Sequence, residues 1–308
     1  MKINKLLSTA VMLLIGVTAH SQVEVVGVGT TRKGGSDAPM PLPESTKSYT
    51  RLAPGKYEGV YEYSVNTSGK DGNPVTDHYT TILQISDDCA KFGDYAAYLT
   101  DSLAASGADG DAITEAQMRE YRTEFYFVPE ILLNNPDGQT TVKDVSGITT
   151  AIYTEPFAGM EWSLTDETDS ISGYLCTKAT SRYAGRDWEA WYTDEIPSPF
   201  GPWKLSGLPG LIIKANDSEG IHSFTLISFR PTDIPVMKTN DSRAIKVDRN
   251  KFIAQRNKFA NTPMGSIDPA SITEISVRKD IGGDFGAVWV NGVQVRMPSN
   301  KLIPLELE

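Results

Sequence analysis

The most unusual chemical grouping in the chain lies around two predicted turns. Three of the five tryptophans, Trp188, Trp191 and Trp203, fall within sixteen residues. Indole rings at the end of a sheet can line a binding site for carbohydrate, peptide or lipid, and Arg186 offers a planar fork to a carboxylate or phosphate. We therefore take Arg186, Trp191, Asp194 and Trp203 as candidates for contact with a ligand or partner.

A structural role is the alternative for the same residues. Trp188 shares one face of a predicted strand with two further core-type side chains, which favours its burial. Arg186 would then pair with Asp194 across two strands. The roles of Trp191 and Trp203 stay open between packing and ligand contact.

The chain shows no recognised catalytic motif. After residue 20 the only histidines are His78 and His222, far apart in the sequence, which argues against a histidine-dependent triad or a histidine-rich metal site. Neither a Gly-x-Ser-x-Gly nor a His-Glu-x-x-His pattern occurs, and there is no P-loop. Residues 109–111 have calcium-loop composition but lack the downstream glutamate. We predict no catalytic residue, no metal and no cofactor.

Residues 201–213 combine glycine, proline and apolar side chains in one run, which includes the six residues Gly207, Leu208, Pro209, Gly210, Leu211 and Ile212. This run resembles the defining signature of the GLPGLI family, secreted proteins of Bacteroidota whose biochemical role is not established. The upstream run 173–197 is similar as well, with its cysteine-containing strand, Gly-Arg step and Ala-Trp-aromatic strand. The ending 303–308 is similar to an Asn-Pro-Ile-Glu-Leu type, with Ile303 in place of the asparagine. The resemblance implies an exported protein but no reaction.

The glycines and the proline of this run suggest a packing and turn device. Proline cannot donate to a sheet ladder, so Pro209 belongs at an edge, a bulge or a strand entry. Gly207 and Gly210 allow backbone angles or close approaches that other residues cannot adopt. The alternative is a loop that contacts a ligand or partner, so Leu208 and Pro209 are also site candidates.

The N-terminus has the three parts of a cleavable signal peptide, predicted at 1–21: Lys2 and Lys5, an apolar core at 6–17, and a small-x-small site before Gln22. The apolar core is too short for a permanent membrane span. Cleavage leaves 27 basic against 39 acidic residues, a net charge of −12, which disfavours nucleic acid. We expect a periplasmic or secreted protein without an integral membrane segment.

The two cysteines, Cys89 and Cys176, are a candidate disulfide in an oxidising compartment. Such a bridge would stabilise the fold by about 4–5 kcal/mol in the loop-entropy model. The alternative is that Cys176, inside an apolar strand, is a buried free thiol.

The remaining pattern predicts a flexible arm or linker at 22–55 and a single domain at 56–308. Within the domain we expect a hairpin of 57–65 with 79–86, helices at 92–103, 113–122 and 247–261, strands at 125–133, 140–145, 148–153 and 161–164, three or four strands within 171–229, and a hairpin at 286–297 around Asn291 and Gly292. Because the strands follow one another without βαβ crossovers, the predicted fold is α+β, with a mainly antiparallel curved sheet, meander or half-barrel-like, packed with a few helices.

A curved sheet with apolar faces and no catalytic motif favours a non-enzymatic binding or carrier protein of the envelope, for an apolar or peptide ligand. One alternative is an accessory protein of an outer-membrane complex, because 270–293 resembles the plug region of TonB-dependent receptors. The other is an uncharacterised hydrolase that uses Arg186, Asp194 and Glu195.

Overall fold

The computed structural model describes residues 47–69, 71–110, 112–114, 127–157, 160–261, 268–278, 287–291, 293–295 and 303–308. The predicted signal peptide, the arm up to residue 46 and most of the predicted helix at 113–122 lie outside these residues.

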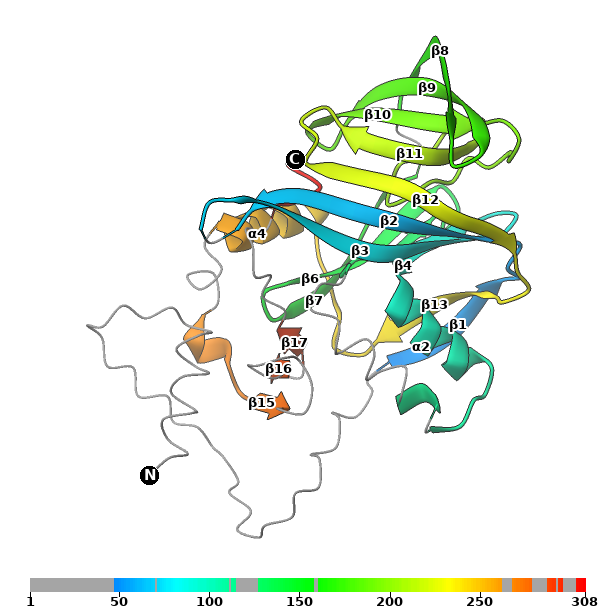
Figure 1. The fold of residues 1–308 in the computed structure, drawn as a ribbon. Coiled ribbons are helices and arrows are strands. Elements are labelled where there is room, and N and C mark those ends of the chain that lie inside the picture. The colour runs from blue at the N-terminus through cyan, green and yellow to red at the C-terminus, as the bar shows by residue number, and fades with distance from the viewer. Residues whose placement is uncertain are drawn as a thin grey trace.

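One twelve-stranded sheet dominates the described part of the chain (Figure 1). Its strands are β2 (Tyr57–Ser68), β3 (Pro74–Ile85), β4 (Ala90–Asp94), β5 (Glu130–Leu133), β6 (Gln139–Ser146), β7 (Thr149–Pro156), β8 (Ser163–Ile171), β9 (Tyr174–Tyr183), β10 (Arg186–Thr193), β11 (Leu211–Asp217), β12 (His222–Pro231) and β14 (Ile245–Lys246). Their order is β14-β7-β6-β5-β4-β3-β2-β12-β11-β10-β9-β8, with β8 and β14 at the edges. Its pairs are antiparallel, except that β14 runs parallel to β7. The predicted mainly antiparallel, curved sheet with few helices is confirmed.

Smaller sheets and helices accompany this sheet. Strand β1 (Lys47–Ala53) pairs with β13 (Val236–Asp241), and β15 (Ile275–Arg278), β16 (Ala287–Val290) and β17 (Val293–Val295) form a three-stranded sheet. Helix α2 (Tyr95–Ala105) packs on β3, β4 and β13, and helix α4 (Arg249–Asn261) packs on β6 and β7. A short 3-10 helix, η2, spans Pro269–Ser271.

Buried and exposed side chains alternate along β2, and the buried face of this strand lies at the centre of the core. Tyr61, Tyr63 and Val65 are buried at every second position, as one face of a half-buried strand requires. The ring of Tyr63 stacks on Phe224 at a centroid distance of 4.6 Å and meets Phe127 edge-on at 5.6 Å. These aromatic pairs join strands that are far apart in the sequence into one core.

Three local predictions differ from the structure. Residues 47–53, within the predicted arm, form β1, because β13 supplies an antiparallel partner. Residues 92–94 belong to β4, and the helix begins at Tyr95 because the Asp94 carboxylate accepts hydrogen bonds from the amides of Ala96 and Ala97. Strand β8 continues to Ile171 through acidic residues, since an edge strand tolerates exposed charge on both faces.

The structure does not contain the candidate disulfide. Cys89 and Cys176 are free and buried. Five strands separate β4, which follows Cys89, from β9, which contains Cys176. A disulfide requires α-carbons within about 7 Å, so this sheet order keeps the two thiols apart.

The six-residue run 207–212 folds as a turn that enters β11. Gly207 has a φ of +94°, which favours glycine, and Pro209 lies exposed ahead of the strand. A Cβ on Gly210 would stand 1.9 Å from the carbonyl oxygen of Thr193, although its φ lies outside the left-handed region. Leu208 and the strand residues that follow are buried in the core. Close backbone approach therefore explains Gly210.

We expect Gly210→Ala to destabilise the protein by about 1–3 kcal/mol, because the new methyl group would displace the backbone of Thr193. Urea denaturation of both proteins measures this difference. The control is Gly93→Ala in β4, where the nearest atom to an added Cβ is 3.7 Å away. Equal stability of Gly210→Ala and the wild-type protein would contradict the packing role of this residue.

Candidate functional site

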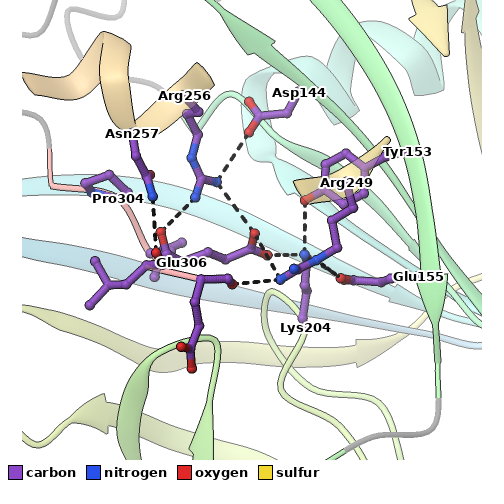
Figure 2. Close-up of polar contacts among 12 residues, drawn as sticks. Asp144, Tyr153, Glu155, Lys204, Arg249, Arg256, Asn257, Pro304 and Glu306 are labelled. Carbon is purple, nitrogen blue, oxygen red and sulfur yellow. Dashed lines mark hydrogen bonds and ion pairs between the residues drawn. The ribbon is translucent and has the colours of Figure 1, made fainter. Parts of the chain in front are cut away.

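A buried ionic cluster connects residues 303–308 to the sheet, to helix α4 and to the turn at 201–206 (Figure 2). We call residues 303–308 the segment. We call the five side chains that hold it the clamp: Arg186 of β10, Lys204 of the turn, and Arg249, Arg256 and Asn257 of α4.

The clamp binds the main chain of the segment. Five successive carbonyl oxygens each accept a hydrogen bond from a clamp side chain: Pro304 from Arg186 Nη2 at 2.7 Å, Leu305 from Arg186 Nε at 3.0 Å, Glu306 from Arg256 Nη2 at 2.8 Å, Leu307 from Asn257 Nδ2 at 3.3 Å and Glu308 from Arg249 Nη2 at 3.0 Å. The amide of Leu307 donates to the carbonyl of Ala184 at 3.0 Å. The segment is thus fixed along its length by groups from distant parts of the chain.

The carboxylate of Glu306 lies at the centre of the cluster, with its side chain only 1% exposed. Lys204 Nζ donates hydrogen bonds to Oε1 of Glu306 and, at 3.1 Å, to the hydroxyl of Tyr153. The same ammonium group forms an ion pair with Glu155 Oε1 at 2.6 Å. Arg249 Nη2 and Arg256 Nη1 each lie 3.8 Å from Glu306 Oε2. Three cations therefore surround one buried carboxylate (Figure 2).

Asp144 of β6 completes the cluster. Its Oδ2 lies 3.9 Å from Arg256 Nη1, and its Oδ1 accepts from the amide of Val145. Burial raises the pKa of Asp144 to about 6, against the opposing effects of Arg256 and the Val145 amide. Burial also raises the pKa of Tyr153, with Glu306 and Glu155 adding to the shift, so the phenol that accepts from Lys204 stays neutral.

The tryptophan-rich turn positions Lys204. Trp203 adopts a φ of +55°, which is rare for a bulky residue, and is buried with its ring 5.5 Å from that of Trp188. The amide of Leu205 donates a hydrogen bond to the carbonyl oxygen of Pro202 at 3.0 Å. A Cβ on Gly201 would lie 2.4 Å from the carbonyl oxygen of Leu205. This tight turn directs Lys204 inward, where its side chain is 2% exposed.

Gly185 and Arg186, at the start of β10, contact the segment. Gly185 has a φ of +78°, and a Cβ there would lie 2.8 Å from the Cβ of Leu307. Arg186 is 3% exposed, and its Nη1 pairs with Asp217 at 2.8 Å. Asp217 also accepts from the amides of Ile221 and His222. Arg186 therefore pairs with Asp217 at the end of β11 and not, as expected, with Asp194.

The structure places the six predicted site residues in different environments. Arg186 contacts the segment, and Trp203 packs beneath the turn that carries Lys204. Trp191 is half-buried and donates to Glu189, with Lys178 Nζ 5.8 Å from its ring. Asp194 and Pro209 are exposed, and Leu208 is buried in the core.

The three groups named for a hydrolase do not form one site. Arg186 begins β10 and is buried, whereas Asp194 follows the far end of that strand and is exposed together with Glu195. His78 lies in β3, and His222 in β12 is buried with its pKa lowered to about 3 by burial and by Arg186. No group of three or more potential metal ligands occurs among the described residues.

Sequence patterns do not indicate a role for five residues of the site: Lys204, Arg249, Arg256, Asn257 and Glu306. Lys204 is a single charge inside an otherwise apolar and glycine-rich run, and Glu306 stands between two leucines. A lone charge in such surroundings indicates burial with a partner, because an unpaired buried charge is very costly. The partner itself, a hundred residues away, leaves no local signal.

A cavity of about 190 Å³ lies where the β6–β7 turn meets α4 and η2. Its lining is Ser146, Gly147, Ile148, Thr149, Gln255, Phe259, Asp268 and Ser271. In the described part of the chain no helix is long and apolar enough to cross a membrane.

A family model described as "Protein of unknown function (Porph_ging)" matches residues 185–214, which include Gly185, Arg186, Lys204 and the 207–212 run. No curated protein matches the chain. A solved structure titled "Structure of PNGF-II in P21 space group" is 17% identical with a TM-score of 0.41, and the match covers 64% of this chain but 32% of that one. The chain thus spans about a third of that structure's length.

A LolA superfamily protein, NE2245 from Nitrosomonas europaea, is 10% identical with a TM-score of 0.23, covering 60% of this chain and 90% of the other. At TM-scores this low we draw no functional conclusion from either similarity.

We expect the stability of the protein to depend on pH through Asp144. Because its pKa of about 6 lies above the value of about 3.9 in an unfolded chain, the folded state binds more protons between about pH 4 and about pH 6. This group's contribution to the free energy of unfolding therefore falls by about 2–3 kcal/mol as the pH rises through that window.

Asp144→Asn removes this titration, so its stability relative to the wild-type protein should increase from about pH 4 to about pH 6. Urea denaturation at several pH values measures the difference. The control is Asp137→Asn, at an exposed turn position. Parallel stability profiles for wild type and Asp144→Asn would contradict the raised pKa.

Proposed function

We propose that the protein is a non-enzymatic binding protein of the cell envelope that holds an extended peptide at the clamp. In this structure the segment 303–308 fills that site. One observation carries the proposal: clamp side chains donate hydrogen bonds to five successive carbonyl groups of the segment. The envelope location rests on the predicted signal peptide.

This mode of attachment differs from that of a strand within the fold. Strands satisfy their polar backbone groups through a ladder with neighbouring strands. Among the described residues, the segment makes one backbone–backbone hydrogen bond outside its own run, between Leu307 and Ala184. Its carbonyls instead meet guanidinium and amide groups, which bind any extended peptide main chain regardless of its side chains.

The side chains of the segment occupy distinct environments. Leu305 is 8% exposed and belongs to the hydrophobic core, Glu306 is buried among cations, and Leu307 is 48% exposed. Main-chain contacts that give affinity, combined with pockets for individual side chains that give specificity, are typical of peptide recognition. An apolar ligand has less support, because stacked rings such as Tyr63 and Phe224 fill the centre of the core.

Exchange of the segment tests the proposal. A protease site inserted between Asn300 and Lys301 allows the folded chain to be cut, so that the segment is held without a covalent link. We expect a fluorescent Ile-Pro-Leu-Glu-Leu-Glu peptide to replace it, with a saturable rise in fluorescence anisotropy. The circular dichroism spectrum of the cut protein, compared with the uncut chain, establishes that it remains folded.

A matched pair of variants on α4 links this binding to the clamp. Asn257→Ala removes the donor to the Leu307 carbonyl and should weaken the peptide about 2- to 10-fold, the value of a hydrogen bond of about 0.5–1.5 kcal/mol. Lys251→Ala, exposed on the same helix, should leave affinity unchanged. A folded cut protein that takes up no peptide would refute the proposed function.

A further inference from the structure

The charges around Glu306 do not balance without it. The cluster contains three cations, Lys204, Arg249 and Arg256. Besides Glu306, it contains the two acids Glu155 and Asp144, which are also largely buried. Glu306 therefore supplies the third negative charge, and its departure would leave one buried cation without compensation.

Such an uncompensated charge is unfavourable enough to control binding. With the segment in place the Lys204 side chain is 2% exposed, so its Nζ depends on protein groups, Glu306 among them, in place of water. Breaking a buried ion pair by removing one partner is strongly destabilising, whereas replacing one carboxylate by another preserves the pairing. The segment site should therefore exchange one acidic peptide for another and discriminate against neutral ones.

The positions on either side of Glu306 narrow the ligand further. The preceding position, held by Leu305, is buried in the hydrophobic core, where an aliphatic side chain fits. The following residue must have an amide hydrogen, because the Leu307 amide donates to Ala184, so proline is excluded there. Gly185 leaves room for the Cβ of the residue at this position, because a Cβ on residue 185 would lie 2.8 Å from that of Leu307.

We propose that the ligand of the clamp is an extended segment of a partner protein in which an aliphatic residue is followed by a glutamate and then by a residue other than proline. Lys204 is the residue that selects the glutamate. This inference rests on the proposed function and specifies its ligand: the partner's segment displaces 303–308 and places its own carboxylate on Lys204.

The test compares peptides on the cut protein, so the clamp itself is unchanged. Relative to Ile-Pro-Leu-Glu-Leu-Glu, the peptide with glutamine at its fourth position should bind about 10- to 100-fold more weakly, the value of a hydrogen bond to a charged group. The matched control has glutamine at the sixth position instead. It loses the same charge at the exposed position of Glu308 and should bind like the parent peptide.

The Lys204→Met variant adds a second measurement. In cut protein carrying this change, the ratio of the affinities for the glutamate and glutamine peptides should fall toward one. If this variant does not fold, the peptide series on the unaltered clamp still decides the matter. A peptide with proline at the fifth position should bind about 2- to 10-fold more weakly, because it lacks the donor to Ala184.

The outcomes separate the two proposals. Equal binding of the parent and the fourth-position glutamine peptide would overturn selection by Lys204 and leave the peptide-binding function intact. Equal weakening by glutamine at the fourth and sixth positions would show general charge attraction, which also overturns it. Failure of every peptide to bind a folded cut protein would refute the proposed function itself.

Discussion

The buried contact between Lys204 and Glu306 is the constraint on which the rest of this structure depends. An ammonium group that is 2% exposed requires a carboxylate, and no residue near Lys204 in sequence provides one that completes the charge balance. The fold therefore brings β7, α4 and the segment to the same point (Figure 2). Because desolvation offsets much of the Coulombic gain, such a pair contributes less to net stability than to the choice of what occupies the site.

Backbone geometry makes this placement possible. Gly185 and Gly210 lie where a side chain would collide with Leu307 or with the Thr193 carbonyl, and Trp203 adopts an uncommon positive φ. An unusual backbone conformation persists only where the surroundings fix it, and here the packing of Trp203 on Trp188 does so. The tryptophans thus act from beneath the site: they hold the turn that points Lys204 at the segment.

Sequence patterns predicted those parts of the fold that are determined by residues close together in the sequence. The β2–β3 hairpin, the hairpin around Asn291 and helix α4 follow from alternation, turn residues and apolar spacing, and the structure contains all three. Sequence patterns failed where the deciding partner is distant: β1 depends on β13, and Arg186 binds a carbonyl 118 residues away. The separation of the two cysteines is another such case, since only the sheet order shows that five strands lie between β4 and β9. Arg186 was identified by its chemistry, but its acid partner was not.

The family model of unknown function matches residues that take part in this arrangement. Residues 185–214 include the Gly-Arg step, the turn that carries Lys204 and the glycine that packs on Thr193. Helix α4 and the segment lie outside them. The matched stretch therefore contains Arg186 and Lys204 of the clamp, whereas the other three clamp side chains lie on α4. In the function that we propose, a surface that binds main-chain carbonyls and one buried carboxylate needs no covalent link to its ligand, so that a segment of another protein can take the place of 303–308.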